Sequence, residues 1–328
     1  MGIVTLTDIE AAARRIEGRI RRTPVDLSPS LSDRAGVPVH LKHEHRQITG
    51  AFKLRGATNA LLQLTPEQRA KGVTAASTGN HGRALAHAAA AEGVRCIVCM
   101  SALVPRNKLD AIAALGAETR IVGRSQDEAQ IEVDRLVAED GMTNVPPFDH
   151  PAIVAGQGTI GLEIVADLPD VETVLVPLSG GGLVAGIAAA VKGLRPDVRV
   201  IAISMRRGAA MQASLAAGHP VEVEELPTFA DSLGGGIGLG NAWTFEAVRS
   251  LVDEVVLLDE AEIAAGIRHA YAEEREIVEG GAAVGIAALL AGKVQPNGPT
   301  LALLSGRNID MQLHRAILNG ANTLEEAA

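Results

Sequence analysis

The sequence has 328 residues, of which 47% are hydrophobic, and a formal net charge of −9. This length and composition predict a sizeable core and leave room for two domains. The negative charge, without a long run of one sign, argues against nucleic acid and anionic membranes as partners. The longest apolar stretch, residues 174–191, is broken by Pro177 and three glycines. It therefore predicts a strand, a loop and a helix, and no membrane span.

Patterns typical of strands and of helices alternate along the chain. Strands are expected at 38–44, 72–77, 95–100, 118–123, 173–178, 198–205 and 301–307. Helices are expected at 52–64, 82–93, 106–116, 126–139, 158–168 and 183–194. Residues 146–159, rich in proline and glycine, are expected to form a loop or a domain boundary. The alternation is typical of an α/β protein with parallel sheets, which bind ligands at the carboxyl ends of their strands.

The two cysteines, Cys96 and Cys99, have a C-x-x-C spacing. This spacing allows a redox pair or half of a zinc site, but the sequence has no second pair of cysteines to complete a zinc site. The stretch is short, apolar and β-branched, which predicts a buried strand whose residues three apart point to opposite faces. We interpret both as core cysteines. A cytoplasmic location is expected, since there is no disulfide framework and no signal-peptide pattern.

The stretch TGAFKLRGA, residues 49–57, places Lys53 between Phe52 and Leu54. A lysine in this position can simply run its stem along apolar surface to reach water. The alternative is that Lys53 is partly desolvated, which lowers the pKa of its amine and makes it a nucleophile able to form a Schiff base. This stretch alone leaves both interpretations open.

The stretch LSGGGLVAG, residues 178–186, runs from an expected strand through three glycines into a helix. Free backbone N–H groups and a helix N-terminus are typical of a phosphate site, and the alternative is a tight turn that binds nothing. The glycines also satisfy a loose dinucleotide pattern, and Arg206 and Arg207 after the next strand would suit the extra phosphate of NADP. An NADP-dependent oxidoreductase is therefore a rival interpretation.

The stretch ASTGNHGRA, residues 76–84, places several polar side chains at an expected helix start; they are Ser77, Thr78, Asn80 and His81. Helix capping explains part of this set. Hydroxyls, an amide and free helix N–H groups would also suit a carboxylate.

A Schiff-base lysine, a phosphate site and a carboxylate site have one common explanation. Pyridoxal phosphate carries an aldehyde for the lysine and a phosphate for the glycines, and its amino-acid substrate carries a carboxylate. Nicotinamide chemistry would explain the glycine loop alone. Ser305, which follows the last expected strand, is by itself an ordinary loop serine.

Residues 41–61, LKHEHRQITGAFKLRGATNAL, resemble the cofactor-lysine region of the threonine/serine dehydratase family, the fold-type II pyridoxal-phosphate enzymes that include serine racemase. The positions that match the family pattern are Lys42, Glu44, Gln47, Thr49, Gly50, Phe52, Lys53, Arg55, Gly56 and Ala57. The stretches STGNHGRALA, AGQGTIGLEI, PLSGGGLVAG and LLSGRNID resemble later motifs of the family, in the same order.

The resemblance covers nearly the whole chain and implies an α/β fold with two doubly wound parallel-sheet domains. We expect a large cofactor-binding domain formed by residues 1–71 and 150–328, and a small domain formed by residues 72–149. The family also implies a homodimer.

The resemblance further implies a role for each candidate residue. Lys53 would carry the cofactor beside Phe52 and act as general base on the α-proton. Asn80 would bond the ring oxygen, and Ser305 the ring nitrogen. The phosphate would be held by Ser179, Gly180, Gly181, Gly182 and Leu183. The substrate carboxylate would face Ser77, Thr78, Gly79, Asn80 and His81.

A serine at the ring nitrogen stabilises a protonated pyridine less well than an aspartate would, and this favours β-elimination over transamination. The implied enzyme is therefore a pyridoxal-phosphate-dependent lyase of amino-acid catabolism. It would remove the hydroxyl group of a 3-hydroxy amino acid as water and release a 2-oxo acid and ammonia. Thr78 would lie on the opposite face of the ring, where a proton donor would permit some racemisation.

The sequence departs from the family at the positions where metal-activated relatives place ligands. Ser204 replaces an acidic residue, and Gly208 and Ala210 follow it. No metal ligand is therefore assigned, and a divalent-metal cofactor has no support. Ala51 also replaces the serine before the Phe-Lys pair.

The substrate is suggested by the glycine-rich stretch 230–238 and by Arg124, Arg206 and Arg207. A roomy pocket with extra cations would suit a second carboxylate, although surface arginines are the simpler interpretation. These stretches also resemble the branch of hydroxyectoine-utilisation dehydratases, which is similar to β-hydroxyaspartate dehydratase.

We therefore expect β-hydroxyaspartate as the substrate, converted to iminosuccinate and then to oxaloacetate and ammonia. L-threonine or L-serine comes next, followed by a hydroxy amino acid derived from hydroxyectoine. A pyridoxal-phosphate protein that binds amino acids without turnover is the alternative outside the enzymes.

Overall fold

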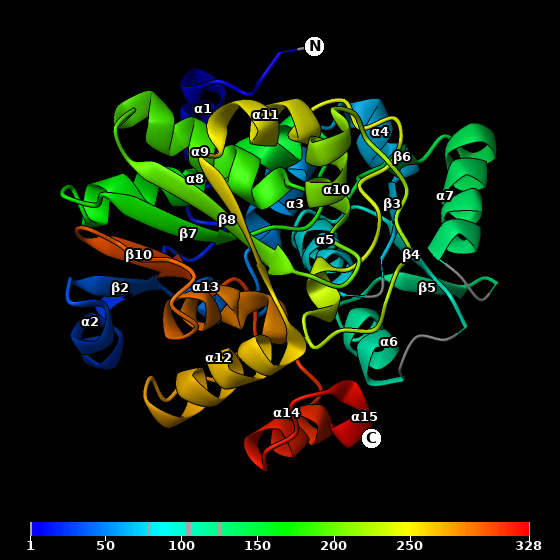
Figure 1. Cartoon of the computed structure of the whole chain (residues 1–328). Helices are drawn as coiled ribbons and strands as arrows, with labels where there is room; N and C mark the ends of the chain where they lie inside the picture. The colour runs from blue at the N-terminus through cyan, green and yellow to red at the C-terminus, as the bar shows by residue number, and fades with distance from the viewer. Residues whose placement is uncertain (1, 78, 103–105, 124–125, 328) are drawn as a thin grey trace.

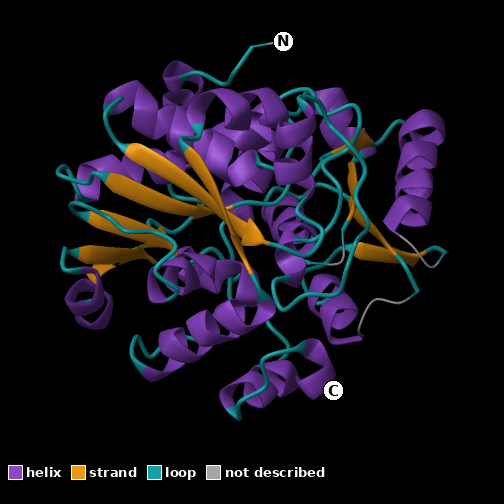
Figure 2. Ribbon diagram, viewed as in Figure 1, coloured by secondary structure: helices purple, strands orange, loops and turns teal. Residues whose placement is uncertain are grey.

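The structure is a computed structural model that describes residues 2–77, 79–102, 106–123 and 126–327. It contains two β-sheets with helices around them (Figures 1 and 2). The larger sheet contains, in spatial order, β1 (Val25–Leu27), β2 (Val39–Lys42), β10 (Thr300–Leu303), β7 (Thr173–Pro177), β8 (Arg199–Met205) and β9 (Glu254–Leu258). The smaller sheet contains β5 (Glu118–Ile121), β4 (Cys96–Met100), β3 (Val73–Ala76) and β6 (Thr143–Asn144). The strand pairs are parallel, except that the short edge strand β1 runs antiparallel to β2. The expected α/β class is confirmed, with an antiparallel edge that the sequence analysis missed.

The helices cover both faces of the larger sheet and flank the smaller one (Figure 1). In the first half of the chain they are α1 (Leu6–Ile16), α2 (Pro29–Ala35), the 3-10 helix η1 (Glu44–Arg46), α3 (Lys53–Leu62), α4 (Pro66–Lys71), α5 (Asn80–Ala91), α6 (Arg106–Ala113), α7 (Gln126–Asp140) and α8 (Pro151–Asp167). In the second half they are α9 (Gly182–Leu194), α10 (Ala210–Ala217), the 3-10 helix η2 (Asp231–Leu233), α11 (Thr244–Leu251), α12 (Glu260–Ala272), α13 (Gly280–Leu290), α14 (Met311–Leu318) and α15 (Leu324–Ala327).

The loop expected at 146–159 is wrong in its second half, because α8 begins at Pro151. Proline is well tolerated in the first turn of a helix, where its missing N–H has no partner to lose. The His150 side chain accepts a hydrogen bond from the backbone N–H of Ala152 and caps the helix.

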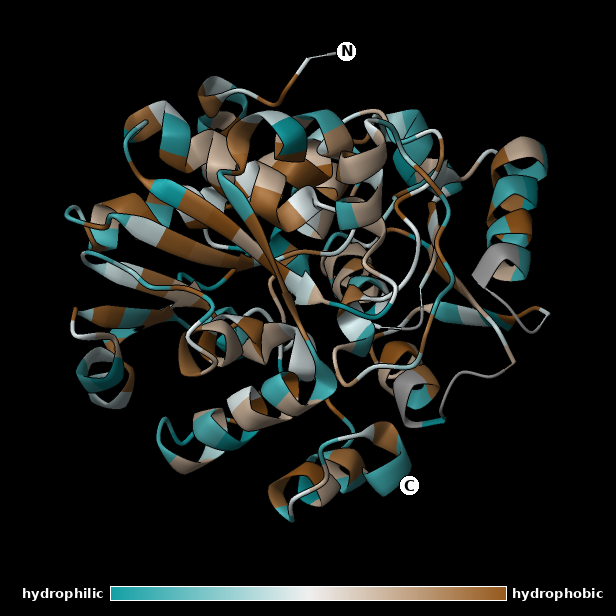
Figure 3. Cartoon of the chain, viewed as in Figure 1, coloured by the Kyte–Doolittle hydropathy of each residue, from teal (hydrophilic) through white to brown (hydrophobic). Residues whose placement is uncertain are grey.

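The central strands of the larger sheet are largely hydrophobic (Figure 3). Their alternating residues enter two different cores. Val174 and Val176 of β7 pack in the core that includes residues of α8 and α9, whereas Leu175 packs in the core that includes residues of α12 and α13. A strand that is buried on both faces has no polar side to show, which explains its uninterrupted apolar sequence. The larger sheet is thus covered on both faces, as expected of a doubly wound domain.

The small sheet confirms the prediction for the cysteines. Both are buried and free; Cys96 packs in one core with residues of α3 and α5, and Cys99 packs in another with residues of α7. All four strands of this sheet lie between residues 73 and 144, and the domain boundaries at 71/72 and 149/150 stay a prediction. Among the described residues, no helix combines the length and apolar character needed to span a membrane.

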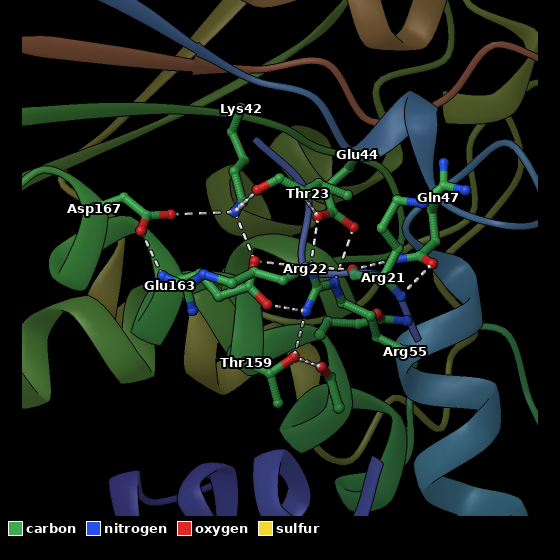
Figure 4. A network of polar contacts seen from close by, with 12 residues as sticks. Arg21, Arg22, Thr23, Lys42, Glu44, Gln47, Arg55, Thr159, Glu163 and Asp167 are labelled. Carbon is green, nitrogen blue, oxygen red and sulfur yellow. Dashed lines mark hydrogen bonds and ion pairs between the residues drawn. The ribbon is translucent and has the colours of Figure 1, made fainter. Parts of the chain in front are cut away.

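A buried network of charges joins α3 to β2, η1 and α8 (Figure 4). Arg55 donates hydrogen bonds to both oxygens of Glu44, at 2.9 and 2.7 Å, and to both oxygens of Glu163, at 2.7 and 3.0 Å. Lys42 donates to Glu163 at 2.6 Å and to the carbonyl of Thr23 at 2.7 Å. Arg55, Lys42 and Glu44 are fully buried and Glu163 is nearly so, and the partly exposed Asp167 lies 3.7 Å from the amine of Lys42, so the buried cations have carboxylate partners.

The network favours the ionised form of Glu163. Burial alone would raise the pKa of Glu163, but the charges and hydrogen bonds of Arg55 and Lys42 outweigh it and lower the pKa below its ordinary value. Removal of one member of a buried ion network leaves an uncompensated charge and costs about 3–5 kcal/mol. The position of α3, and with it that of Lys53, depends on all four groups.

We predict that Glu163→Gln lowers the free energy of unfolding of the holoenzyme by about 3–5 kcal/mol, because it leaves Arg55 and Lys42 without their shared carboxylate. Glu254→Gln is the matched control: it removes the exposed pair with Arg199, which should cost less than about 1 kcal/mol. Urea unfolding measures both. Similar losses in the two variants would contradict a special role for the network.

The same network predicts a sign for the pH dependence of stability. The pKa of Glu163 is lower in the folded chain, so its contribution is present above the unfolded pKa and is lost as the pH falls through the folded pKa. On acidification, the wild type should therefore lose more stability than Glu163→Gln. Unfolding curves at neutral and acidic pH test this difference.

Candidate active site

Lys53 opens α3 and points its amine at the segment that precedes α8. Its Nζ donates a hydrogen bond to the carbonyl of Pro147 at 2.7 Å and lies 5.2 Å from the centre of the Phe52 ring. Burial lowers the pKa of Lys53 to about 8, although the charge of Glu279 acts in the opposite direction. More neutral amine is present near pH 7 than in an ordinary lysine. The geometry therefore favours the desolvated, nucleophilic interpretation of Lys53.

The glycine loop connects β7 to α9 and is shaped to hold an anion. Gly181 has a φ of +88°, and a Cβ there would lie 2.8 Å from the Met211 side chain. A Cβ at Gly180 would overlap the ring of Phe148. No side chain caps the start of α9 at Gly182, so its first N–H groups are available to a ligand. Such a cradle suits a phosphate group. Of its flanking residues, Leu183 is buried and Ser179 is half-buried.

Residues 147–149 hold Lys53 and the glycine loop side by side. Pro147 accepts the hydrogen bond from Lys53, and the next residue, Phe148, packs against Gly180. The carboxylate of Asp149 then accepts hydrogen bonds of 2.7 to 2.9 Å from three backbone N–H groups at the start of α11, those of Ala242, Trp243 and Thr244. One short segment thus ties together three elements that are far apart in sequence.

The loop before α5 combines a helix cap with open space. Ser77 Oγ accepts a hydrogen bond from the N–H of Gly82 at 3.1 Å and another from the N–H of Gly79 at 3.4 Å. The capping interpretation of Ser77 is therefore correct. A Cβ added to Gly79 would meet nothing within 4 Å, so the loop faces room for a ligand at the N-terminus of α5. Thr78 lies outside the described residues.

His81 is buried beside this loop and carries no charge. Its Nε2 donates to the carbonyl of Val145 at 2.7 Å, and its Nδ1 has no hydrogen-bond partner among the residues that the structure describes. Burial, followed by the charge of Lys53, lowers the pKa of His81 to about 3. The tautomer assigned by this hydrogen bond has no free ring N–H. His81 thus offers its ring to a carboxylate only as an acceptor, and the backbone N–H groups of α5 are the better donors.

Asn80 is held by two residues that the sequence analysis missed, Glu279 and Asn308. Its Nδ2 donates to Glu279 Oε1 at 2.7 Å, and its Oδ1 accepts from Asn308 Nδ2 at 2.5 Å. The backbone N–H of Asn308 donates to the other oxygen of Glu279 at 3.0 Å. Burial, followed by repulsion from Asp231, raises the pKa of Glu279 to about 7. A buried acid with this pKa is poised between its two protonation states near neutral pH.

The sequence carried weak signals for these two residues. Glu279 is the acidic residue that precedes the otherwise apolar helix α13, and acidic residues are common at helix starts. Asn308 stands in LLSGRNID, three residues after Ser305, where only the serine drew attention. Neither signal says that the two residues meet Asn80.

Ser305 lies where β10 meets the lysine segment. It is buried, and its carbonyl accepts a hydrogen bond from the N–H of Phe52 at 3.0 Å. Ala51 forms an isolated bridge to Gly306. The structure therefore brings Lys53, Phe52 and Ser305 to one place, as expected.

Of the arginines suggested for a second carboxylate, Arg206 and Arg207 make no hydrogen bond to the site residues in the described part of the chain. Arg206 is exposed. The positive charge of Arg207 interacts electrostatically with the carboxylate of Glu325 in α15. Within the described part of the chain, neither side chain hydrogen-bonds Lys53, Asn80 or the glycine loop. Arg124 lies outside the described residues.

Comparison with known proteins decides which chemistry this site serves. The family model described as "Pyridoxal-phosphate dependent enzyme" matches residues 16–306. The chain belongs to this family. A protein of Sinorhizobium fredii named "Putative threonine dehydratase" is 63% identical over 97% of this chain and 96% of its own length. The "L-threonine ammonia-lyase" of Thermotoga maritima is 40% identical over 97% of this chain and 79% of its own.

The fold agrees with the sequence comparison. Maize serine racemase superposes on this chain with a TM-score of 0.90 and 31% identity, over 94% of this chain and 95% of that one. The expected fold-type II class, the pyridoxal-phosphate cofactor and the dehydratase and ammonia-lyase class are therefore confirmed. The rival NADP-dependent oxidoreductase is wrong.

The residues at the site fit pyridoxal phosphate. The buried amine of Lys53 suits its aldehyde, and the glycine loop, where Cβ atoms would overlap Phe148 and Met211, leaves backbone N–H groups for its phosphate. We assign Asn80 and Ser305 to its ring oxygen and ring nitrogen, as predicted. These individual assignments remain proposals.

We predict that the uptake of pyridoxal phosphate by cofactor-free protein accelerates as the pH rises through about 8, because only the neutral amine of Lys53 reacts. Glu279→Gln should move this midpoint to lower pH, since it removes the charge that favours the ammonium form. The return of visible absorbance measures the rate. Glu254→Gln, at an exposed site, is the control. A wild-type midpoint near 10.5, the value of an ordinary lysine, would contradict the prediction.

Proposed function

We propose that this chain dehydrates and deaminates a 3-hydroxy amino acid with Lys53 as the catalytic base. The observation that carries the proposal is the half-buried Lys53, whose amine donates to the carbonyl of Pro147 at 2.7 Å, next to the residue that packs on the glycine loop. Desolvation lowers its pKa to about 8. The names of the similar proteins from Sinorhizobium fredii and Thermotoga maritima support the same reaction class.

Each part of the site has a role in this reaction. The bound cofactor supplies an electron-withdrawing ring that stabilises the negative charge left on the substrate when the α-proton is removed. Lys53, neutral because it is desolvated, accepts that proton. The N-terminus of α5 holds the substrate carboxylate, and the glycine loop anchors the phosphate. Glu279 and Asn308 orient the side-chain amide of Asn80.

The neutral hydroxyl of Ser305 favours elimination over a long-lived carbanion. The β-hydroxyl leaves as water with the proton that Lys53 has taken from the α-carbon, and the product takes up water to give a 2-oxo acid and ammonia. Thr78 is proposed, from the resemblance alone, as a proton donor on the opposite face.

We propose β-hydroxyaspartate as the preferred substrate, supported by Arg83 of α5. This half-buried guanidinium lies one turn after Asn80 and donates to Asn308 Oδ1 at 3.1 Å. Burial lowers its pKa, which indicates an incompletely compensated cation, although Glu279 acts in the other direction. In the described part of the chain it forms no ion pair within 4.0 Å. A second substrate carboxylate would supply the missing partner.

L-threonine and L-serine are the second candidates, favoured by the names of the relatives. The hydroxy amino acid derived from hydroxyectoine is the third. Glu225 and Asp231 lie beside the glycine-rich stretch 234–238 and would suit an amino group on such a substrate.

We predict that the holoenzyme releases ammonia fastest from one isomer of β-hydroxyaspartate, with kcat/KM about 100-fold or more above those for L-threonine and L-serine. Ammonia release is measured with all substrates side by side, with and without EDTA. Lys53→Ala should lose the visible absorbance of the cofactor and all activity. Faster turnover of threonine or serine would contradict the substrate proposal and leave the reaction class intact.

Arg83→Gln should lower kcat/KM for β-hydroxyaspartate about 100-fold, because a charge-assisted pair to the second carboxylate is lost. Its effect on L-threonine, which has no second carboxylate, should be much smaller. Arg207→Gln, next to Glu325, is the matched control and should change neither value. If Arg83→Gln lowered kcat/KM equally for both substrates, the role of Arg83 would be to hold Asn308, and the proposed contact to a second carboxylate would be wrong.

We further propose that the chain acts as a homodimer in the cytoplasm. The dimer is supported by the family resemblance, and the location by the two free cysteines, which are typical of reducing compartments. Light scattering of the purified holoenzyme measures the molecular mass, and a mass of one chain would contradict the dimer.

A further inference from the structure

Two histidines and a glutamate meet at the end of β2, away from the groups assigned above. His43 and His45 flank Glu44 of the charge network, and Glu276 lies in the connection from α12 to α13, three residues before Glu279. His43 and His45 are 3% and 1% exposed. The backbone N–H of His45 donates to the carbonyl of Leu304 at 2.7 Å, so the cluster borders the strand that leads to Ser305.

The imidazole rings of this cluster have unmet bonding capacity. In the described part of the chain, His43 Nδ1, His43 Nε2 and His45 Nδ1 are buried without hydrogen-bond partners. A buried polar atom without a partner destabilises the fold, and such atoms call for an explanation. Three of the four ring nitrogens of two neighbouring histidines are in this state, although the carboxylate of Asp26 lies 3.2 Å from His43 Nε2.

We propose that His43, His45 and Glu276 bind a divalent transition-metal ion of the zinc type. One ligand atom from each residue lies within 4.8 Å of the others. His45 Nε2 is 2.7 Å from Glu276 Oε2, and His43 Nδ1 is 3.8 Å from Glu276 Oε1. Bonds to zinc of about 2.0–2.2 Å place neighbouring ligand atoms roughly 3.4 Å apart, a value between these two distances. Small side-chain rotations suffice.

The ligand set selects the class of metal. Two imidazoles and one carboxylate suit zinc and its neighbours, whereas magnesium prefers oxygen ligands alone. This site is separate from positions 204–210, where the family resemblance would have put a metal.

Asp26 completes the arrangement from the edge strand β1. Its Oδ2 lies 3.2 Å from His43 Nε2, on the side of the ring away from Glu276. A metal-bound histidine commonly donates its other N–H to a carboxylate, which fixes the tautomer and the direction of the ring. With the ion bound through Nδ1, His43 would donate from Nε2 to Asp26.

The guanidinium of Arg46 lies beside the carboxylates of Glu276 and Asp26 and supplies the positive charge that a bound ion would otherwise supply. The guanidinium contacts Glu276 Oε1, and its Nη1 lies 3.9 Å from Asp26 Oδ2. The side chain is 40% exposed, so it can turn into water when an ion enters. A divalent cation between Glu276 and Asp26 would balance both carboxylates. Metal and Arg46 therefore compete for Glu276, a feature that a purely structural ion pair would not show.

The test is zinc titration of the tag-free holoenzyme in competition with a chromogenic chelator. We expect one tightly bound Zn²⁺ per wild-type chain, and about 100-fold weaker binding in His45→Gln. Arg46→Gln should bind zinc roughly ten-fold more tightly, because a repelling charge is gone. His219→Gln, at an exposed histidine, is the matched control and should match the wild type.

Arg46→Gln keeps the proposal testable if His45→Gln does not fold, because Arg46 is exposed. Cobalt bound to Arg46→Gln should also give the intense visible absorption of a four-coordinate site. Failure of the wild type to bind zinc, unchanged binding in His45→Gln, or unchanged or weaker binding in Arg46→Gln would each overturn the proposal. Ammonia release does not enter the readout, so the result is independent of the proposed reaction.

Discussion

The ion network around Arg55 is the constraint on which the position of Lys53 depends. Arg55 lies two residues after Lys53 in the same helix and binds Glu44 and Glu163 at four points. None of these groups touches water to any large extent, so the helix cannot shift without breaking charge-assisted bonds. Lys53 itself makes a single hydrogen bond, to a carbonyl. Its amine is held in place by its neighbours and stays free to react.

The protonation states of Lys53 and Glu279 are set by a balance between burial and electrostatic attraction. Burial disfavours charge on both Lys53 and Glu279, and it moves the pKa of Lys53 down to about 8 and that of Glu279 up to about 7. The two groups thus titrate close to physiological pH, and each partly stabilises the charged form of the other. Through Asn80, Glu279 also touches the residue proposed for the cofactor ring. Charge on the lysine and orientation of the amide are therefore coupled.

Local pattern was enough to find the main elements of the fold and most parts of the candidate site. Apolar runs indicated the parallel strands, and glycine loops after them marked the carboxyl ends where ligands bind. The pattern failed at α8, where a proline that is typical of loops starts a helix. It also grouped Lys42, Glu44 and Arg55 with Lys53 as a single motif. The structure gives these three residues a different role, because they form the buried network that supports the helix.

The sequence by itself determined the α/β class, the phosphate-type loop and the unusual lysine, because each follows from residues close together in the chain. Only the tertiary structure decided that Glu279 and Asn308 hold Asn80, across separations of 199 and 228 residues. It alone also placed Arg207 near Glu325 and brought Glu276 to the two histidines. Hydrogen bonds and charges act over a few ångströms of space, and no local pattern records which distant segments the packing of the sheets will bring within that range.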